Sequence, residues 1–284
     1  MKWTVLLGLL ATACVAGCGP QPYVTEARLQ RGLVVVLPGI EGRGPLNAAV
    51  VEGLNAGGVN WAIQVADWTS VLGPLYNLRA VDRNRRQAAQ IAADVAAYRR
   101  SHPGRPVVLV GHSGGGAIAA WAAEALPAGH HVDGIIMLAP SLVPQYRLSK
   151  ALAASRRGIV NFSSRLDWAF LGLGTALAGT MDGRRGPSAG AVGFQVPPGA
   201  RMLYEKLYQV TWRPEMAATG HVGGHFSATA PAFVAEYVAP FVLAPDWDWA
   251  LVRRVLRSGG GAQPPDRGNP ALEDLDVSAP LFER

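Results

Sequence analysis

Short runs of mainly apolar residues recur along the chain and predict the strands of a sheet. The run at 107–110 consists of Val and Leu and does not alternate with polar residues, which is typical of a parallel strand buried on both faces. Six such runs are found, at 33–37, 61–65, 107–110, 134–139, 159–163 and 207–212. We expect these six segments to form one central sheet.

The segments between the runs predict helices. Residues 46–56 fit a short helix, and apolar residues recur at helical spacing from Ala88 to Tyr98. Asp82 and Asn84 are the candidate caps for the start of this second helix. Because helix-length segments separate the strands, the sequence predicts a three-layer α/β fold with a mostly parallel sheet of about six strands.

Three further connections complete the expected order of elements. Residues 67–81 are predicted to be a loop, residues 144–157 a single helix and residues 231–242 a closing helix. A helix over 144–157 fills the connection between the fourth and fifth strands. We therefore expect no large cap domain there.

The third apolar run leads directly into a serine flanked by glycines. Ser113 lies between a predicted strand and the small-residue helical segment that starts at Ala117. A turn this sharp brings the residues around the serine into close contact, and Gly111 and Gly115 remove the side chains that would collide. The G-x-S-x-G pattern in a strand–turn–helix context is that of a nucleophile elbow. Ser113 is therefore the candidate nucleophile.

A serine hydroxyl needs a base, and the base needs a carboxylate to orient it. Asp167 follows the fifth predicted strand, so its side chain is expected at the same rim of the sheet as Ser113. Asp182, in a glycine-rich loop, is the second candidate for this acid. Asp133 precedes its strand and is expected at the opposite edge.

The candidates for the base are His221 and His225, which follow the last predicted strand. Their spacing of four also allows a zinc pair, but the glycines around them oppose the helix that would bring both onto one face. His112 adjoins the nucleophile and is expected to pack beside the site. The other three histidines precede strands and are expected at the far edge of the sheet.

From about residue 33 to 243 the chain resembles the α/β-hydrolase superfamily. The elbow at 111–115, Asp167 and a Gly-His-Phe sequence near the end carry this resemblance. In many members a proline lies six residues after the catalytic histidine, and Pro231 has this spacing from His225. The resemblance implies a triad of Ser113, Asp167 and His225. One departure is that the usual leading antiparallel hairpin is missing.

The resemblance also implies an oxyanion hole formed by backbone N–H groups. Gly114, after the nucleophile, supplies one donor, and Ile40, after the first strand, supplies the other. Because the HGGG form of this loop is absent, Gly39 and Glu41 remain alternatives to Ile40.

The predicted reaction is hydrolysis of carboxylic esters through an acyl-enzyme, on a small-molecule or lipid ester. The same three residues also serve amidases, peptidases and thioesterases. A catalytically silent binding module on the same scaffold is a further alternative. No cofactor is required by this chemistry and none is expected, and the sequence does not indicate an oligomeric state.

The first residues are typical of a secretory signal, with a positive start and an apolar stretch. Residues 15–18 (Val-Ala-Gly-Cys) resemble a bacterial lipobox, which predicts a lipid on Cys18; Cys14 is a poorer match, and an ordinary cleaved signal is the alternative. The expected divisions are a lipoprotein signal peptide at 1–17, a tether at 18–32, a catalytic domain at 33–243 and a tail at 244–284. The predicted location is the bacterial cell envelope, lipid-anchored at the membrane, or outside the cell.

Charge and cysteine content narrow the function further. The 26 basic and 20 acidic residues give a net charge of +6, but the basic clusters are short and lack interleaved aromatic residues. A nucleic-acid partner is therefore not expected. Both cysteines lie in the first 18 residues, which excludes a disulfide or a cysteine nucleophile in the predicted domain.

Overall fold

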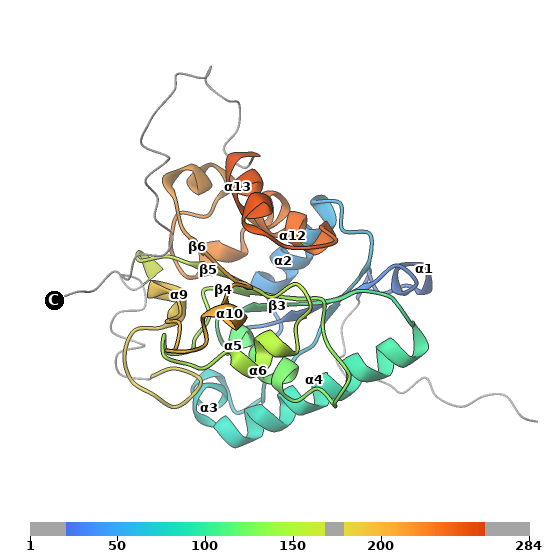
Figure 1. Cartoon of the computed structure of the whole chain (residues 1–284), viewed down its shortest axis with the longest axis horizontal. Helices are drawn as coiled ribbons and strands as arrows, with labels where there is room; N and C mark the ends of the chain where they lie inside the picture. The colour runs from blue at the N-terminus through green and yellow to red at the C-terminus, as the bar shows by residue number, and fades with distance from the viewer. Residues whose placement is uncertain (1–20, 168–178, 259–284) are drawn as a thin grey trace, which may run out of the picture.

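Six parallel strands form one sheet at the centre of the molecule (Figure 1). The computed structural model describes residues 21–167 and 179–258. All six predicted strands are confirmed, with ends that differ by at most two residues. They are β1 (Leu33–Leu37), β2 (Ala62–Val65), β3 (Val107–His112), β4 (Gly134–Leu138), β5 (Ile159–Ser163) and β6 (Leu207–Thr211).

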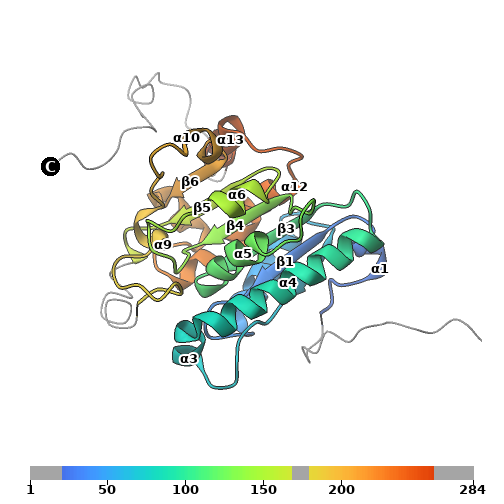
Figure 2. The same cartoon turned by 60° about the horizontal axis from the view of Figure 1, so that its bottom comes forward.

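Helices cover both faces of this sheet, as Figure 2 shows from a second direction. The helices α4 (Val81–Ser101) and α5 (Gly114–Glu124) pack on one face, against side chains such as Leu109. The opposite face, which includes Val108, is covered by α2 (Pro45–Ala56), α12 (Ala239–Leu243) and α13 (Trp249–Ser258). Successive strand residues point to opposite faces, so apolar runs without alternation fill two cores at once.

Shorter helical segments connect these elements. The α-helical ones are α1 (Glu26–Leu29), α3 (Pro74–Arg79), α6 (Ser149–Ala153), α9 (Ala189–Val192), α10 (Arg201–Tyr204) and α11 (Pro231–Phe233). Two 3₁₀ segments span Pro214–Thr219 and Phe226–Thr229, and a π segment spans Val234–Val238. The predicted closing helix is thus confirmed as a helical stretch of α11, the π segment and α12.

The strands lie in the order β2-β1-β3-β4-β5-β6, so β2 is on one side of β1 and all later strands are on the other side. After β1 the chain moves outward to β2, and it then returns to place β3 on the other side of β1. The segments that leave the carboxyl ends of β1 and β3 therefore diverge and leave a crevice. In open parallel sheets this is where ligands bind.

Two expected elements were wrong. Residues 67–81 contain α3, which starts at Pro74, where the fixed backbone angle of proline favours a first helical turn. The predicted helix over 144–157 is reduced to α6, because backbone groups before it bond elsewhere: Pro144 O accepts from the Gln195 N–H, and the Leu148 N–H donates to Tyr204 Oη.

The predicted caps of α4 were also wrong. The helix begins at Val81 with Ala80 in the cap position, so Asp82 lies within the first turn. Asn84 is fully buried, and its amide donates to the backbone oxygen of Asn77. That bond ties α4 to α3 instead of capping α4.

Both ends of the domain extend beyond their predicted limits. Residues from 21 onward, predicted as part of a tether, are bonded to the domain: the guanidinium of Arg28 donates to the oxygens of Val59 and Trp61. In the predicted tail, Trp247 is buried and donates to the oxygen of Phe241, and α13 buries Leu251 in the core.

The predicted signal peptide, Cys14, Cys18 and the chain after Ser258 lie outside the described residues. Within residues 21–167 and 179–258, no helix has the length and apolar character needed to cross a membrane.

Candidate active site

The turn at Ser113 joins β3 to α5 in a conformation that few residues other than glycine adopt. Ser113 has φ 53° and ψ −117°. The backbone is held by bonds from the Ser113 N–H to Leu138 O (2.9 Å) and from the Ser141 N–H to Ser113 O (3.0 Å). Such strain persists only where surrounding contacts fix it, and it is frequent at functional sites.

The two glycines around this turn are required by close backbone contacts. A Cβ on Gly111 would overlap the carbonyl of Gly115, and a Cβ on Gly115 would overlap the carbonyl of Leu37. The predicted need for glycine at both positions is thus confirmed, and the structure adds that the elbow packs directly on the end of β1.

Asp167 and His225 form a buried hydrogen-bonded pair. His225 Nδ1 donates to Asp167 Oδ1 over 2.9 Å, and the two residues are 7% and 2% exposed. Asp167 follows β5, and His225 lies in the loop after β6, so the parallel sheet brings both to the same edge. With Nδ1 directed at the carboxylate, Nε2 is the nitrogen left to exchange a proton.

A cavity of about 260 Å³ contains both Ser113 and His225. Its apolar wall is formed by Ile40 after β1, by Pro74 and Leu78 of α3, and by Phe226. Its polar groups include Glu41, Ser141 and Ser188. Apart from Ile40 and Glu41, none of these residues was predicted from the sequence to line the site. The only signal for them was their position in segments that leave the carboxyl ends of strands.

Ile40 and Gly114, the predicted oxyanion donors, lie against each other. A Cβ on Gly114 would come within 2.9 Å of Ile40 Cγ2. Among the described residues, neither backbone N–H has a hydrogen-bond acceptor. The loop that carries Ile40 is held by Trp68, whose Nε1 donates to Pro38 O over 2.8 Å.

Glu41 places a carboxylate in this otherwise largely apolar cavity. Loss of water around the carboxylate raises the pKa of Glu41, while the backbone N–H groups of Glu41 and Gly39 and the charge of His225 act in the opposite direction. The carboxylate also contacts Gly39, so this side chain fills the space beside the first strand's loop.

The other acid candidates are bonded away from His225. Asp182 accepts from Thr180 Oγ1 over 2.6 Å and from the Val143 N–H over 3.4 Å. Asp133 lies at the amino edge of the sheet, as expected, and pairs with Arg99 over 2.6 Å. Burial alone would raise the pKa of Asp133, but its hydrogen bonds and the neighbouring arginines lower it.

His221 is buried apart from the Asp167–His225 pair. Its Nδ1 lies 2.9 Å from Ser227 Oγ, and its ring packs edge-on against Phe233. Within the described ranges, no group of three or more His, Cys, Asp or Glu side chains is gathered as metal ligands would be.

Comparisons with known proteins give the same architecture. The family model described as "Serine aminopeptidase, S33" matches residues 77–172, about a third of the chain. Lipase B from Aspergillus fumigatus superposes with a TM-score of 0.53 and 14% sequence identity, over 84% of this chain and 58% of that one. This chain therefore spans less than two thirds of the length of that lipase. The chain therefore has the α/β-hydrolase fold.

Two other solved structures are similar to this chain at lower scores. LpqC, a poly(3-hydroxybutyrate) depolymerase from Bordetella parapertussis, has a TM-score of 0.45 and 16% identity, over 79% of this chain and 85% of that one. Est1E from Butyrivibrio proteoclasticus has a TM-score of 0.43 and 15% identity, over 75% and 87%. No curated protein sequence matches the chain.

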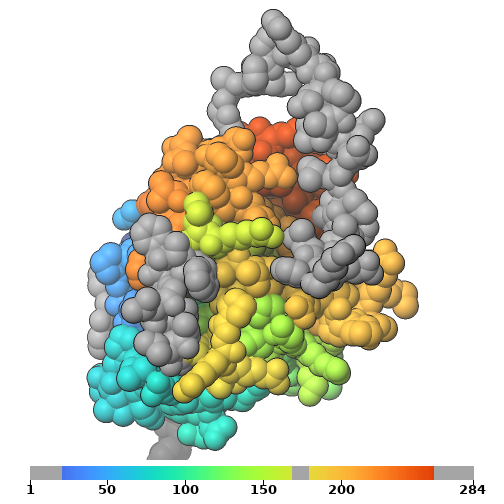
Figure 3. Space-filling model, turned by 90° about the vertical axis from the view of Figure 1, so that its left-hand side faces the viewer, coloured from blue at the N-terminus to red at the C-terminus, as the bar shows by residue number. Residues whose placement is uncertain are grey.

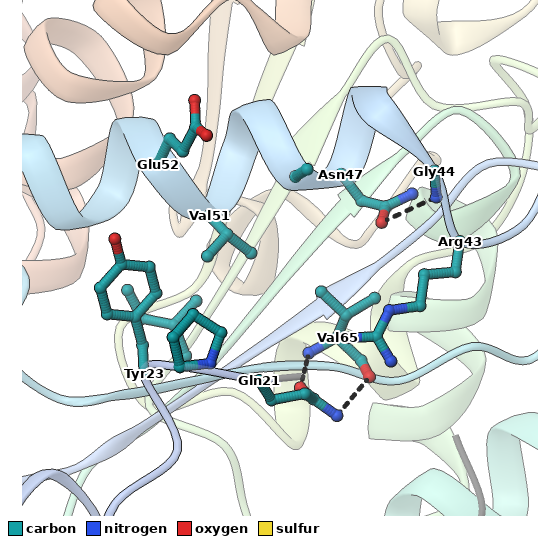
Figure 4. A pocket seen from close by; sticks show the side chains of 11 residues that line it. Gln21, Tyr23, Arg43, Gly44, Asn47, Val51, Glu52 and Val65 are labelled. Atoms are coloured by element: carbon teal, nitrogen blue, oxygen red, sulfur yellow. Dashed lines mark hydrogen bonds between the residues drawn. The ribbon is translucent and has the colours of Figure 1, made fainter. Parts of the chain in front are cut away.

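A second cavity, of about 370 Å³, lies at the β2 edge beneath α2 (Figure 4). The side chain of Gln21 bonds to both backbone groups of Val65 there, and Arg43 and Glu52 also line this cavity. None of the predicted catalytic residues lines this cavity.

Proposed function

We propose that this α/β-hydrolase cleaves carboxylic esters with Ser113 as nucleophile. The observation that carries the proposal is the 2.9 Å bond from His225 to Asp167 at the wall of the cavity that also contains Ser113. A buried carboxylate that holds one imidazole nitrogen leaves the other to act as base toward a neighbouring hydroxyl.

In the proposed reaction, Ser113 Oγ attacks the carbonyl carbon while His225 Nε2 takes its proton. The backbone N–H groups of Ile40 and Gly114 stabilise the oxyanion of the tetrahedral intermediate. The ester C–O bond then breaks, His225 returns the proton to the leaving alcohol, and an acyl-Ser113 remains. Water attacks this acyl group and gives a proton to His225. The bond between the acyl carbon and Ser113 Oγ then breaks, His225 returns the proton to Ser113 Oγ, and the acid is released.

Labelling with a fluorophosphonate tests the nucleophile. We expect one covalent adduct on Ser113, and loss of both the adduct and p-nitrophenyl ester hydrolysis in Ser113→Ala. The His225→Ala variant should lose turnover, whereas His221→Ala, the matched control in the same loop, should keep it. A folded protein that takes no label would overturn the proposal.

Amide hydrolysis is the second candidate. The partial match to a family described as a serine aminopeptidase favours it. Aminoacyl p-nitroanilides separate the two reactions when compared with p-nitrophenyl esters of the same acyl group. A higher kcat/KM on the anilide would assign the amide bond as the substrate.

We also propose that Cys18 carries a lipid and holds the protein at a bacterial envelope membrane. The sequence at residues 15–18 supports this anchor. Metabolic labelling with an alkyne fatty acid should mark the wild-type chain and leave Cys18→Ser unmarked.

A further inference from the structure

Large apolar side chains are exposed at the edge of the sheet where the candidate active site lies. Within residues 21–167 and 179–258, most exposed large apolar residues belong to segments that leave the carboxyl ends of strands. We use the term apolar rim for six of them, Val71, Leu72, Leu75, Leu166, Val222 and Phe226. Exposure of large apolar side chains to water is unfavourable in free energy, and clusters of such side chains mark interaction sites.

The apolar rim borders the cavity from two sides. On one side, Leu72 and Leu75 flank Pro74, which lines the cavity together with Leu78. On the other side, Phe226 lines the cavity and is also 58% exposed. Leu166 reaches this second side, since it contacts the backbone of Gly223.

The segments after β2, β5 and β6 meet on one face of the molecule. Figure 3 views this face, with the chain around α3 in cyan, the segment after residue 179 in yellow and the segment after β6 in orange. The remaining exposed apolar residues are not all on this face. Met202 and Leu243 lie in α10 and α12, and Figure 2 shows α10 and α3 at opposite ends of the molecule.

Exposed arginines accompany the apolar rim. Arg79 ends α3, Arg165 precedes Leu166, and Arg185 lies in the segment that supplies Gly179 and Ser188 to the cavity. Among the described residues, these three arginines form no ion pair. Of the nearby acids, Asp67 is already bonded to Thr69 and to the Arg43 N–H.

We propose that the apolar rim docks on the surface of an anionic lipid layer and presents the cavity to lipid ester substrates in that layer. The apolar side chains would enter the acyl region, while the arginines pair with anionic headgroups. The substrate part of this inference rests on the proposed ester hydrolysis, whereas the docking part does not.

The start of the described chain supports this orientation. The side chain of Gln21 is bonded to Val65, the last residue of β2, and so lies near the carboxyl end of that strand. Three residues span at most about 10 Å when extended. A lipid on Cys18 would therefore begin close to the edge of the sheet that carries the apolar rim.

Vesicle binding tests docking without turnover. The protein is the full chain with Ser113→Ala and Cys18→Ser, so that it neither hydrolyses lipid nor carries one. Co-sedimentation with vesicles of phosphatidylglycerol and phosphatidylcholine is compared for Leu72→Ser/Leu75→Ser and for the control Met202→Ser/Leu243→Ser, which removes exposed apolar residues elsewhere. We expect binding about tenfold weaker for the rim variant only. Equal binding by both variants would overturn docking through this face.

The headgroup charge is tested with Arg79→Ala in the same background. Each arginine near an anionic surface contributes about fivefold in affinity. We expect that loss on vesicles containing phosphatidylglycerol and no change on vesicles of phosphatidylcholine alone. An equal loss on both would overturn the assignment of an anionic layer.

Turnover separates failure of docking from failure of the proposed function. With an active Ser113, hydrolysis of a soluble short-chain ester should be equal in the rim variant and its control. Hydrolysis of a long-chain ester should rise when that ester aggregates, and the rise should be lost in the rim variant alone. If neither ester is hydrolysed, the proposed function fails while the vesicle result stands.

A second copy of the chain is the competing occupant of the apolar rim. Sedimentation velocity of the same variants in the absence of lipid distinguishes it. A dimer that the rim variant abolishes and the control retains would overturn the lipid assignment, and a single species of unchanged mass in both supports it.

Discussion

His112 and His225, which are 113 residues apart in the chain, are joined by a hydrogen bond of 3.1 Å between His112 Nε2 and the backbone oxygen of His225. A carbonyl oxygen only accepts, so neutral His112 carries its proton on Nε2. Burial first, and the charge of His225 second, lower the pKa of His112 to about 3. His112 therefore positions the loop of the candidate base and stays uncharged at neutral pH.

Replacing His112 tests this positioning role. His112→Leu removes the donor and leaves the buried oxygen of His225 unsatisfied, at a cost of about 1–3 kcal/mol. We expect kcat for a p-nitrophenyl ester to fall about tenfold or more with KM nearly unchanged. His112→Gln keeps an N–H donor and should recover part of kcat. Equal kcat in the two variants would contradict a role through this bond.

Asp167 should contribute to turnover far more than Asp182. Asp167→Asn removes the charge that stabilises a protonated His225, and we expect kcat to fall by about 10³-fold or more. Asp182→Asn changes a carboxylate bonded to Thr180 and Val143, so its kcat should stay within about tenfold of the unmodified protein. Steady-state kinetics on one ester measures both. Similar losses of kcat in Asp167→Asn and Asp182→Asn would contradict the greater contribution of Asp167.

Gly115 should tolerate no side chain. In Gly115→Ala the new Cβ meets the backbone of Leu37, which cannot move without distorting β1. We expect a loss of about 3 kcal/mol in the free energy of unfolding, measured with urea. Gly44→Ala is the control, because no heavy atom lies within 4 Å of its added Cβ. If Gly115→Ala loses no more unfolding free energy than Gly44→Ala, the backbone around Ser113 must be able to move and accommodate the new Cβ.

Buried neutral histidines should make the fold sensitive to acid. Burial lowers the pKa of His221 to about 4, with Asp167 acting in the opposite direction. Between this value and the ordinary pKa of 6.5 the unfolded chain binds the extra proton, so stability is complete above about pH 6.5 and decreases as the pH falls toward 4.

The His221→Asn variant tests this pH dependence. Between pH 6.5 and pH 5, its free energy of unfolding should fall less steeply than that of the unmodified protein. The two slopes should differ by up to about 1.4 kcal/mol per pH unit. Urea unfolding at both pH values gives the comparison. Parallel curves would assign the acid sensitivity to other groups.

The sequence alone was sufficient for the six strands, the long helices α2, α4 and α5, and the turn at Ser113. Each depends on contacts over a few residues: uninterrupted apolar runs favour buried strands, and glycines at 111 and 115 permit the elbow. A signal for α13 was present as well, because Leu251, Val252 and Val255 recur at helical spacing. The Gly and Pro residues around this segment led to the prediction of a tail instead.

Only the tertiary structure decided which distant side chains meet. The sequence selected Asp167 and His225 from several acids and histidines, and the sheet order then brings these residues, 58 positions apart, to 2.9 Å. The bond of His112 to His225 and the apolar rim had no sequence signal, because segments that leave separate strands build them. Local preferences extend over a few residues, whereas the parallel arrangement of β1 to β6 sets which loops share an edge.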